Sequence, residues 1–155
     1  MLTVEQQATN FATMRHIERV RNLLNLFVKD LLRRAEEHDQ SKLESPEVEM
    51  FTDFTPKLAA STYGSEEYEG FRKAMGAALS HHYARNPHHP EHHKDGINDM
   101  NLLDIMEMFA DWKAAGERHN DGNILKSIEK NAGRFGISQQ LTRILENTAK
   151  LFDAK

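Results

Sequence analysis

The sequence predicts an all-α protein, a single domain over residues 1–155 in which about six helices pack around one core. Apolar residues recur at three- and four-residue steps over long stretches, which is typical of amphipathic helices. No segment has the alternation expected of a strand, and no internal repeat or low-complexity linker divides the chain. At 155 residues the chain is long enough to bury a substantial core.

The composition excludes several classes of function. A hydrophobic content of 39% and a charged content of 28% are ordinary for a globular protein. The net charge of −4 gives no electrostatic footprint for nucleic acid or for an anionic membrane. The first residues lack the pattern of a signal peptide, and no apolar stretch approaches the roughly 18 residues needed to span a bilayer. We therefore expect a soluble, cytoplasmic protein.

The chain contains no cysteine, which excludes disulfides, thiolate metal sites and cysteine nucleophiles. Any metal would have to be bound by nitrogen and oxygen ligands.

The N-terminal half begins with the strongest helical pattern of the chain. Apolar residues recur at helical spacing over residues 11–37, which predicts one amphipathic helix. The Ser-Pro pair at 45–46 is typical of a helix start and predicts a short helix through Phe51. The Thr-Pro pair at 55–56 repeats that signal.

Further helices are expected downstream, over residues 66–83, 100–115 and 124–131 and from Ser138 onward. Ser65 is placed to cap the first of these helices, and Gly116 is placed to end the second.

A histidine-rich tract, HHYARNPHHPEHH, occupies residues 81–93 and holds six of the nine histidines. Imidazole is the commonest protein ligand for transition metals, so the tract indicates a metal centre. Two other interpretations remain open from the tract alone. It could be a nonspecific chelator on the surface, or a polar loop around Pro87 and Pro90.

Helix phase separates the first two histidines of the tract. Phe71, Met75, Ala78 and His82 fall on one face, so His82 should point toward the core. His81 lies off that face and is the weaker candidate.

Carboxylates that could complete a metal site occur at two places. Asp104, Glu107 and Asp111 share one edge of the predicted helix 100–115, although we expect Asp104 to be exposed. His38 and Asp39 stand side by side at the end of the first helix, where the aspartate could bridge two cations or the pair could merely cap the helix. Mixed histidine and carboxylate ligands suit one or two ions of Mn, Fe, Co, Ni or Zn rather than Ca.

Two resemblances follow from these motifs. HDQSK, TPKLAASTYGSEEY, HHYARNPHHPEHH, MNLLDIMEMFADWKAA and SIEKNAGRFGIS resemble a family of small phage and bacterial proteins with no established reaction, over nearly the whole chain. The order of a histidine on the first helix, a His-Asp pair, further histidines and a late aspartate is similar to the HD-domain superfamily of metal-dependent phosphohydrolases, whose fold is a helical bundle.

The HD resemblance implies a set of metal ligands and neighbouring roles. Lys42 would hold a phosphate or a metal-bound hydroxide, and Glu107 would orient water or accept its proton. The implied metal ligands are His16, His38, Asp39, His82, His88, His89 and Asp111, with His92 as a neighbour or substitute in the tract. Three basic residues that could gather around an anionic substrate are Arg118, Lys126 and Arg134.

His16 departs from the HD pattern. It lies 22 residues before His38, so an unbroken helix would separate the two by about 33 Å. Three possibilities remain open. The chain reverses near Asn22 and Asn25, or His16 reaches a site in a partner chain, or it is not a ligand.

The resemblance implies a metal-dependent phosphohydrolase that uses a metal-bound hydroxide on a nucleotide or another small phosphate ester. Two other functions remain open. One is a di-iron oxygenase on an HD-like bundle, and the other is a non-catalytic nucleotide-binding or regulatory phage protein with a structural metal. The chain could also form a homo-oligomer.

Overall fold

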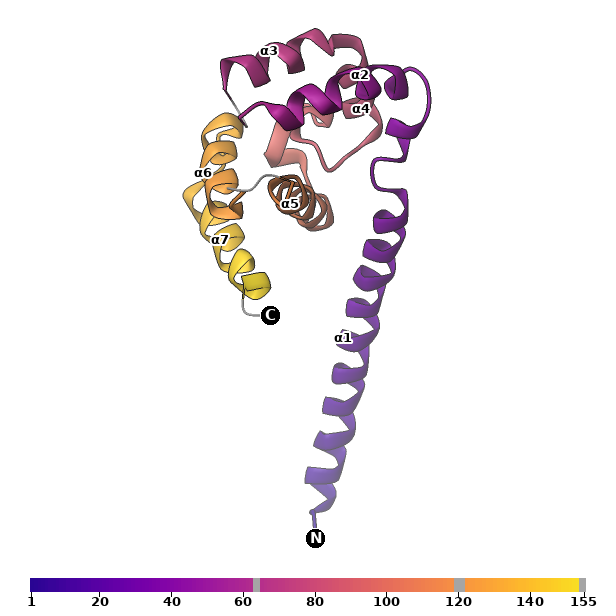
Figure 1. Ribbon diagram of the computed structural model, residues 1–155. Coiled ribbons are helices and arrows are strands. Elements are labelled where there is room, and N and C mark those ends of the chain that lie inside the picture. The colour runs from indigo at the N-terminus through magenta and orange to yellow at the C-terminus, as the bar shows by residue number, and fades with distance from the viewer. Residues whose placement is uncertain (63–64, 119–121, 154–155) are drawn as a thin grey trace. The chain divides into compact units, whose positions relative to one another are not determined.

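The structure is a computed structural model that describes residues 1–62, 65–118 and 122–153. Most of these residues are helical, and no strand occurs among them (Figure 1). The all-α prediction is confirmed, with seven α-helices in the described part of the chain where about six were expected. In none of the described segments is there a helix of the length and hydrophobicity that a bilayer requires. Backbone contacts divide the chain into two units, residues 1–37 and 38–155, which we describe separately.

The first unit is the helix α1, Val4–Glu37, the continuous indigo helix in Figure 1. It runs unbroken through Asn22 and Asn25, so the reversal considered there does not occur. A rise of 1.5 Å per residue places His16 about 32 Å along the helix from Glu37. The possibility that the chain reverses and brings His16 back to the His38-Asp39 pair is therefore excluded.

The second unit begins with a short 3₁₀ helix, η1 (Gln40–Leu43), and the helix α2 (Glu47–Ala60). α2 starts directly after Pro46, close to the predicted start. The second start predicted at residues 55–56 is wrong, because α2 continues through Pro56. Proline has no backbone N–H, so the helix loses one hydrogen bond there without ending.

The helix predicted over residues 66–83 is two helices, α3 (Glu66–Ala74) and α4 (Gly76–Arg85). Gly76 stands at the break with a φ of 22°, which a residue without a side chain adopts readily. The predicted cap is confirmed, since the Ser65 hydroxyl accepts a hydrogen bond from the Tyr68 amide at 3.2 Å. His82 on α4 is buried, as helix phase predicted.

Two short 3₁₀ helices, η2 (Pro90–His92) and η3 (Gly96–Asp99), lead to the three C-terminal helices α5 (Leu102–Gly116), α6 (Ile124–Phe135) and α7 (Gln139–Asp153). α6 contacts both α5 and α7. Their shared core holds Met100, Met108, Phe109, Trp112, Ile124, Ile128, Ile137, Leu145 and Ala149.

The buried face of α5 differs from the predicted one. Helical spacing places Leu102 and Met106 on the broad apolar side of this helix, yet they are 75% and 52% exposed. Asp104, expected to be exposed, is only 2% exposed. Its carboxylate accepts a hydrogen bond from the Asn101 amide at 2.9 Å, while the Asn101 side chain accepts from the Asp104 amide at 3.1 Å. This capping box satisfies amide groups at the start of the helix, which is why the carboxylate is buried.

Candidate metal centre

The His38-Asp39 pair lies in the turn that follows α1. Asp39 has a φ of 56°, a left-handed conformation that aspartate adopts more readily than most residues. Its carbonyl accepts a hydrogen bond from the Lys42 amide at 2.9 Å, which closes η1. Non-glycine residues in this conformation are concentrated at functional sites.

The histidine tract divides into residues that hold the loop and residues that face Asp39. His92 Nδ1 lies 2.8 Å from the Tyr83 carbonyl oxygen, and His93 Nε2 lies 2.8 Å from the Pro87 carbonyl oxygen. Both rings therefore donate to the backbone and fasten the loop. His82, His88 and His89 instead point toward one another and toward Asp39.

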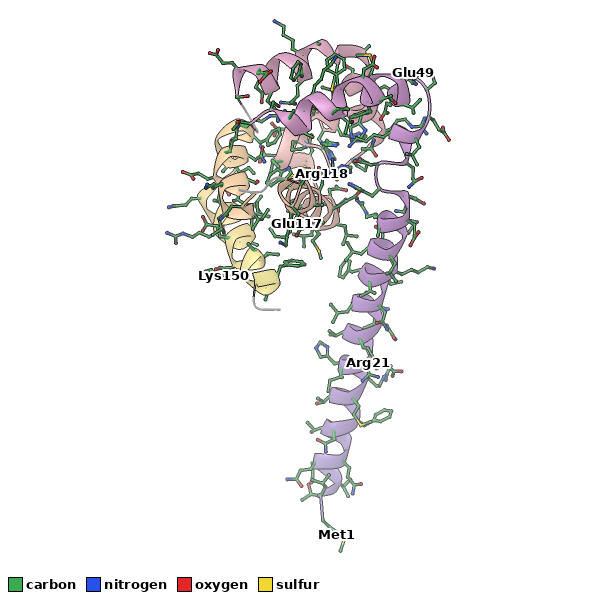
Figure 2. The ribbon with its side chains drawn as sticks, in the orientation of Figure 1. Met1, Arg21, Glu49, Glu117, Arg118 and Lys150 are labelled. Carbon is green, nitrogen blue, oxygen red and sulfur yellow. The ribbon has the colours of Figure 1, made fainter. Side chains whose placement is uncertain are left out.

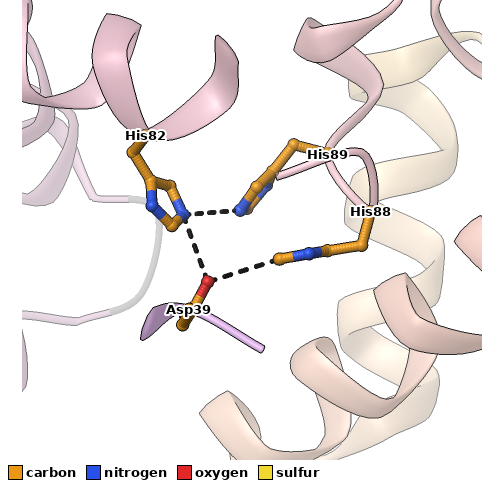
Figure 3. Close-up of side chains that lie close together, drawn as sticks. All are labelled: Asp39, His82, His88 and His89. Carbon is orange, nitrogen blue, oxygen red and sulfur yellow. Dashed lines mark hydrogen bonds and ion pairs between the residues drawn. The ribbon is translucent and has the colours of Figure 1, made fainter. Parts of the chain in front are cut away.

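These three histidines and Asp39 form the first of three groups that could hold a metal ion, which we call site A (Figure 3). One ligand atom from each residue lies within 4.8 Å of the other three. Asp39 Oδ1 is 3.4 Å from His82 Nε2 and 3.6 Å from His88 Nε2. His82 Nε2 is 2.9 Å from His89 Nε2. Bonds of about 2.1 Å to one ion would separate neighbouring ligand atoms by roughly 3.0–3.4 Å, so the donor set fits an ion.

Two donor atoms of site A are buried without a hydrogen-bond partner among the described residues. They are Asp39 Oδ1 and His88 Nε2. Buried polar atoms are almost always hydrogen-bonded, because the loss of water around an unpaired one is costly. A cation between these atoms would satisfy both.

The second and third groups lie beside site A. His38, Asp39 and Asp111 form one, which we call site B, with His38 Nε2 at 3.5 Å from Asp39 Oδ2 and 3.9 Å from Asp111 Oδ1. His38, His88 and Glu107 form the other. The two oxygens of Asp39 thus face different sites, so that this residue could bridge two ions.

Glu107 contacts the opposite edge of two imidazoles. Its Oε1 lies 2.9 Å from His38 Nδ1 and 3.0 Å from His88 Nδ1. The contact to His38 is a hydrogen bond, whereas the contact to His88 is an ion-pair distance without hydrogen-bond alignment. In both rings Nδ1 faces Glu107 while Nε2 faces Asp39, as metal-binding histidines are usually held.

The electrostatics of the group keep most of the ligands in the protonation state that metals require. Burial, together with the nearby rings of His88 and His82, lowers the pKa of His89 to about 2. Burial and the Lys42 ammonium lower the pKa of His82. Burial raises the pKa of Asp39, but Lys42 and the rings of His38 and His82 together outweigh it, and the net shift is downward. These groups are a carboxylate and neutral imidazoles, which have lone pairs to donate.

His38 differs from these imidazoles. Its hydrogen bond with Glu107 raises its pKa, and the Asp39 and Asp111 carboxylates act in the same direction against burial.

Of the basic side chains predicted to bind a phosphate or a substrate, Lys42 is the one for which a contact with a residue of the metal-binding groups is found. Its ammonium donates a hydrogen bond to Asp39 Oδ2 and lies 5.0 Å from the centre of the Phe51 ring. Because Asp39 Oδ2 also faces His38 Nε2 of site B, an ion held at site B would lie near the Lys42 ammonium.

The three basic residues predicted to bind substrate are not part of these groups. Arg134 donates to Glu91 Oε1 at 2.6 Å and stacks on the Phe135 ring. Lys126 is exposed on α6 and lines a surface pocket with residues of α7. Arg118 is exposed just beyond the end of α5 (Figure 2). A role in substrate binding stays a prediction for all three.

Three residues around the centre had little or no signal in the sequence. Glu47 is fully buried and contacts His82, and it resembles any other glutamate at the start of a helix. Ser41 lies within the HDQSK motif but carries no charge that would attract notice. Asn86 follows His82 by four residues, and that spacing was its only signal.

Comparison with known proteins gives a family and nothing more specific. No curated protein and no solved structure matches the chain. One family model matches residues 5–151, which include α1 except for its first residue, the histidine tract and every residue of the three metal-binding groups. The chain therefore belongs to this family, which is described as a family of unknown function, DUF5662.

Proposed function

We propose that the protein is a metal-dependent phosphohydrolase that acts on a nucleotide or another small phosphate ester, in the cytoplasm of a bacterial or phage-infected cell. One observation carries the proposal. Three imidazoles and a carboxylate converge in site A, and two of their buried donor atoms have no hydrogen-bond partner. A nonspecific surface chelator would not need buried, converging side chains.

A divalent ion bound at site A would supply a Lewis acid that polarises a phosphoryl oxygen and lowers the pKa of water. His82, His88, His89 and Asp39 would hold it. Site B offers a second position through the other oxygen of Asp39. Two adjacent cations are a common arrangement in phosphate-ester hydrolysis, because together they stabilise the charge on the attacking and the leaving oxygens.

The chain also offers a group for the phosphate. The side chain of Lys42 is 30% exposed, and its ammonium is fixed beside Asp39. An ammonium has three donors, so Lys42 can keep its contact with Asp39 and donate to a phosphate oxygen as well. Placing a positive charge where the phosphoryl oxygens gain negative charge would stabilise the transition state.

The HD-domain likeness supports the proposal at the level of chemistry. The adjacent His38 and Asp39, the histidines of α4 and the following loop, and Asp111 on α5 occur in the order of that superfamily. The first histidine of the pattern does not reach these sites through a reversal of the chain, since His16 lies in the middle of an unbroken helix. We propose that site A compensates, because it has three histidines without His16.

The test begins with full-length protein purified without a histidine tag. Elemental analysis would report the metal content, and a panel of nucleotides and phosphodiesters would report hydrolysis. We expect one or two transition-metal ions per chain and hydrolysis of at least one ester. Protein that retains its metal but hydrolyses nothing would overturn the proposal, and bound iron with an oxygen-dependent spectrum would favour the di-iron oxygenase.

Asp39→Asn is the informative variant, because asparagine tolerates the left-handed backbone of residue 39 as well as aspartate does. Asp53→Asn on α2 is the matched control, since Asp53 is exposed and belongs to none of the three groups. We expect the Asp39 variant to lose metal and hydrolysis together and the Asp53 variant to keep both.

A further inference from the structure

Glu47 is a fully buried carboxylate whose position the metal-binding groups do not explain. It is the first residue of α2, its side chain is 0% exposed, and it belongs to none of the three groups. Glutamate is rarely buried completely unless its charge is paired. The contacts of Glu47 therefore indicate what the carboxylate does.

Both oxygens of Glu47 contact histidines of α4. Oε1 lies 2.6 Å from His81 Nδ1, and Oε2 lies 3.0 Å from His82 Nδ1. Oε2 also accepts a hydrogen bond from the Ser41 hydroxyl at 3.0 Å. One carboxylate thus joins the start of α2, the η1 turn next to Asp39, and two neighbouring residues of α4.

The hydrogen atoms around Glu47 can be assigned from the donors. The side-chain nitrogen of Asn86 has two hydrogens and lies near three possible acceptors, the His82 carbonyl oxygen at 2.8 Å, the Ser41 oxygen at 2.9 Å and His82 Nδ1 at 3.0 Å. We assign its two hydrogens to the two oxygens, which are the nearer acceptors. The Ser41 hydroxyl then gives its own hydrogen to Glu47. With the Asn86 hydrogens given to the two oxygens and Glu47 ionised, the carboxylate can only accept, which places the hydrogen between Glu47 and His82 on Nδ1.

This assignment fixes the tautomer of His82. With the hydrogen on Nδ1, the neutral ring has its lone pair on Nε2, which is the atom that faces Asp39 Oδ1 and His89 Nε2 in site A. The ring cannot turn over without breaking the contact to a buried carboxylate. Partners of this kind orient the ligating histidine and increase its basicity.

We propose that Glu47 is a positioning residue for site A, which fixes the tautomer and the orientation of His82 and thereby strengthens metal binding. The inference rests on the metal centre of the proposed function. Helix phase gave no reason to expect a role for His81. Its ring is partly exposed and contacts Oε1 of Glu47, the oxygen that does not face His82, and so holds that oxygen in place. Glu47 and Glu107 would then have the same role, because Glu47 faces Nδ1 of His82 and Glu107 faces Nδ1 of His38.

Cobalt(II) is a suitable probe, because its visible absorption reports both binding and coordination. Full-length protein stripped of metal would be titrated with Co²⁺ as wild type, as Glu47→Gln and as Glu49→Gln. Glu49 lies in the same first turn of α2 and is exposed, so it is the matched control (Figure 2). We expect Glu47→Gln to weaken Co²⁺ binding by about 10- to 100-fold and to change its spectrum, and Glu49→Gln to match wild type.

Equal affinity and an equal spectrum in the Glu47→Gln variant would overturn the inference while leaving the metal centre in place. Wild-type protein that fails to bind Co²⁺ would overturn the proposed function and this inference together. The two failures are therefore distinguishable.

A second measurement needs no variant and applies if Glu47→Gln does not fold. Imidazole nitrogen NMR of wild-type protein, metal-free and loaded with Zn²⁺, would report which nitrogen of His82 carries the hydrogen. We expect Nδ1 to be protonated in both states. A hydrogen on Nε2 of the metal-free protein would overturn the inference.

Discussion

The Nε2 atoms of His82 and His89 lie 2.9 Å apart, with the two rings tilted by 68° to each other. Each ring approaches the other through a nitrogen that is either a donor or an acceptor, so the pair can share only one hydrogen. Protonating both rings would place two positive charges in contact within a buried site. The arrangement instead suits a cation that both lone pairs bind.

The first prediction separates a built metal site from a histidine-rich chelator. His89→Ala removes one nitrogen of site A, and His92→Ala removes a neighbouring ring that only fastens the loop. We expect His89→Ala to weaken transition-metal binding by at least tenfold and His92→Ala to change it by less than about threefold. Calorimetric titration of the metal-free protein measures both. Equal losses in the two variants would favour the chelator.

The second prediction concerns the role of Glu107. Its Oε1 contacts Nδ1 of His38 and His88, so Glu107→Gln should weaken metal binding by about 10- to 100-fold. If Glu107 were solely the proton acceptor of the reaction, the variant would bind metal normally and lose only turnover. Comparing metal affinity with the hydrolysis rate at saturating metal distinguishes the two roles. Glu117→Gln, near the exposed end of α5, is the control.

The third prediction is that metal stabilises the fold. An ion that binds the folded state alone adds free energy of unfolding by mass action, about 2.7 kcal/mol at a free concentration 100 times the dissociation constant. Thermal unfolding with Zn²⁺ and with EDTA measures the difference. We expect it to vanish in Asp39→Asn, because Asp39 belongs to both site A and site B. A difference that persists in that variant would mean that Zn²⁺ stabilises the protein from another position.

The fourth prediction concerns the core of the C-terminal helices. Ile128 is 0% exposed on α6, so Ile128→Ala should lower the free energy of unfolding by about 2–5 kcal/mol. Leu125→Ala on the same helix should cost much less, because Leu125 is 44% exposed. Urea unfolding monitored through Trp112, which lies in this core, would report both changes. Similar costs in the two variants would contradict the assigned core.

The fifth prediction concerns the start of α5. Asn101→Ala removes the side-chain acceptor of the capping box and should lower the free energy of unfolding by about 1 kcal/mol. The same urea experiment measures it, with Asn98→Ala in η3 as a control outside the capping box. A decrease in the free energy of unfolding well below about 1 kcal/mol would mean that other contacts hold the buried Asp104 in place.

Local sequence patterns predicted the positions of most helices well. They predicted less well where a helix is interrupted and which of its residues are buried. The three- and four-residue apolar steps indicated α1 and α5 to α7, and Ser65 and Gly116 marked true helix ends. The interruption at Gly76 was missed, because one glycine within a helical pattern is a weak signal. The burial of Asp104 was missed because the capping box depends on how Asn101 enters the helix, which periodicity does not report.

By itself, the sequence determined the all-α class and the metal-binding residue types, since helix periodicity and the nitrogen and oxygen donors are properties of the residues themselves. Only the tertiary structure decided which of six neighbouring histidines meet Asp39, that α1 does not fold back on itself, and that Glu47 lies behind His82. The contacts of Asp39 and Glu47 with the histidines join segments more than thirty residues apart, and no local pattern records such packing.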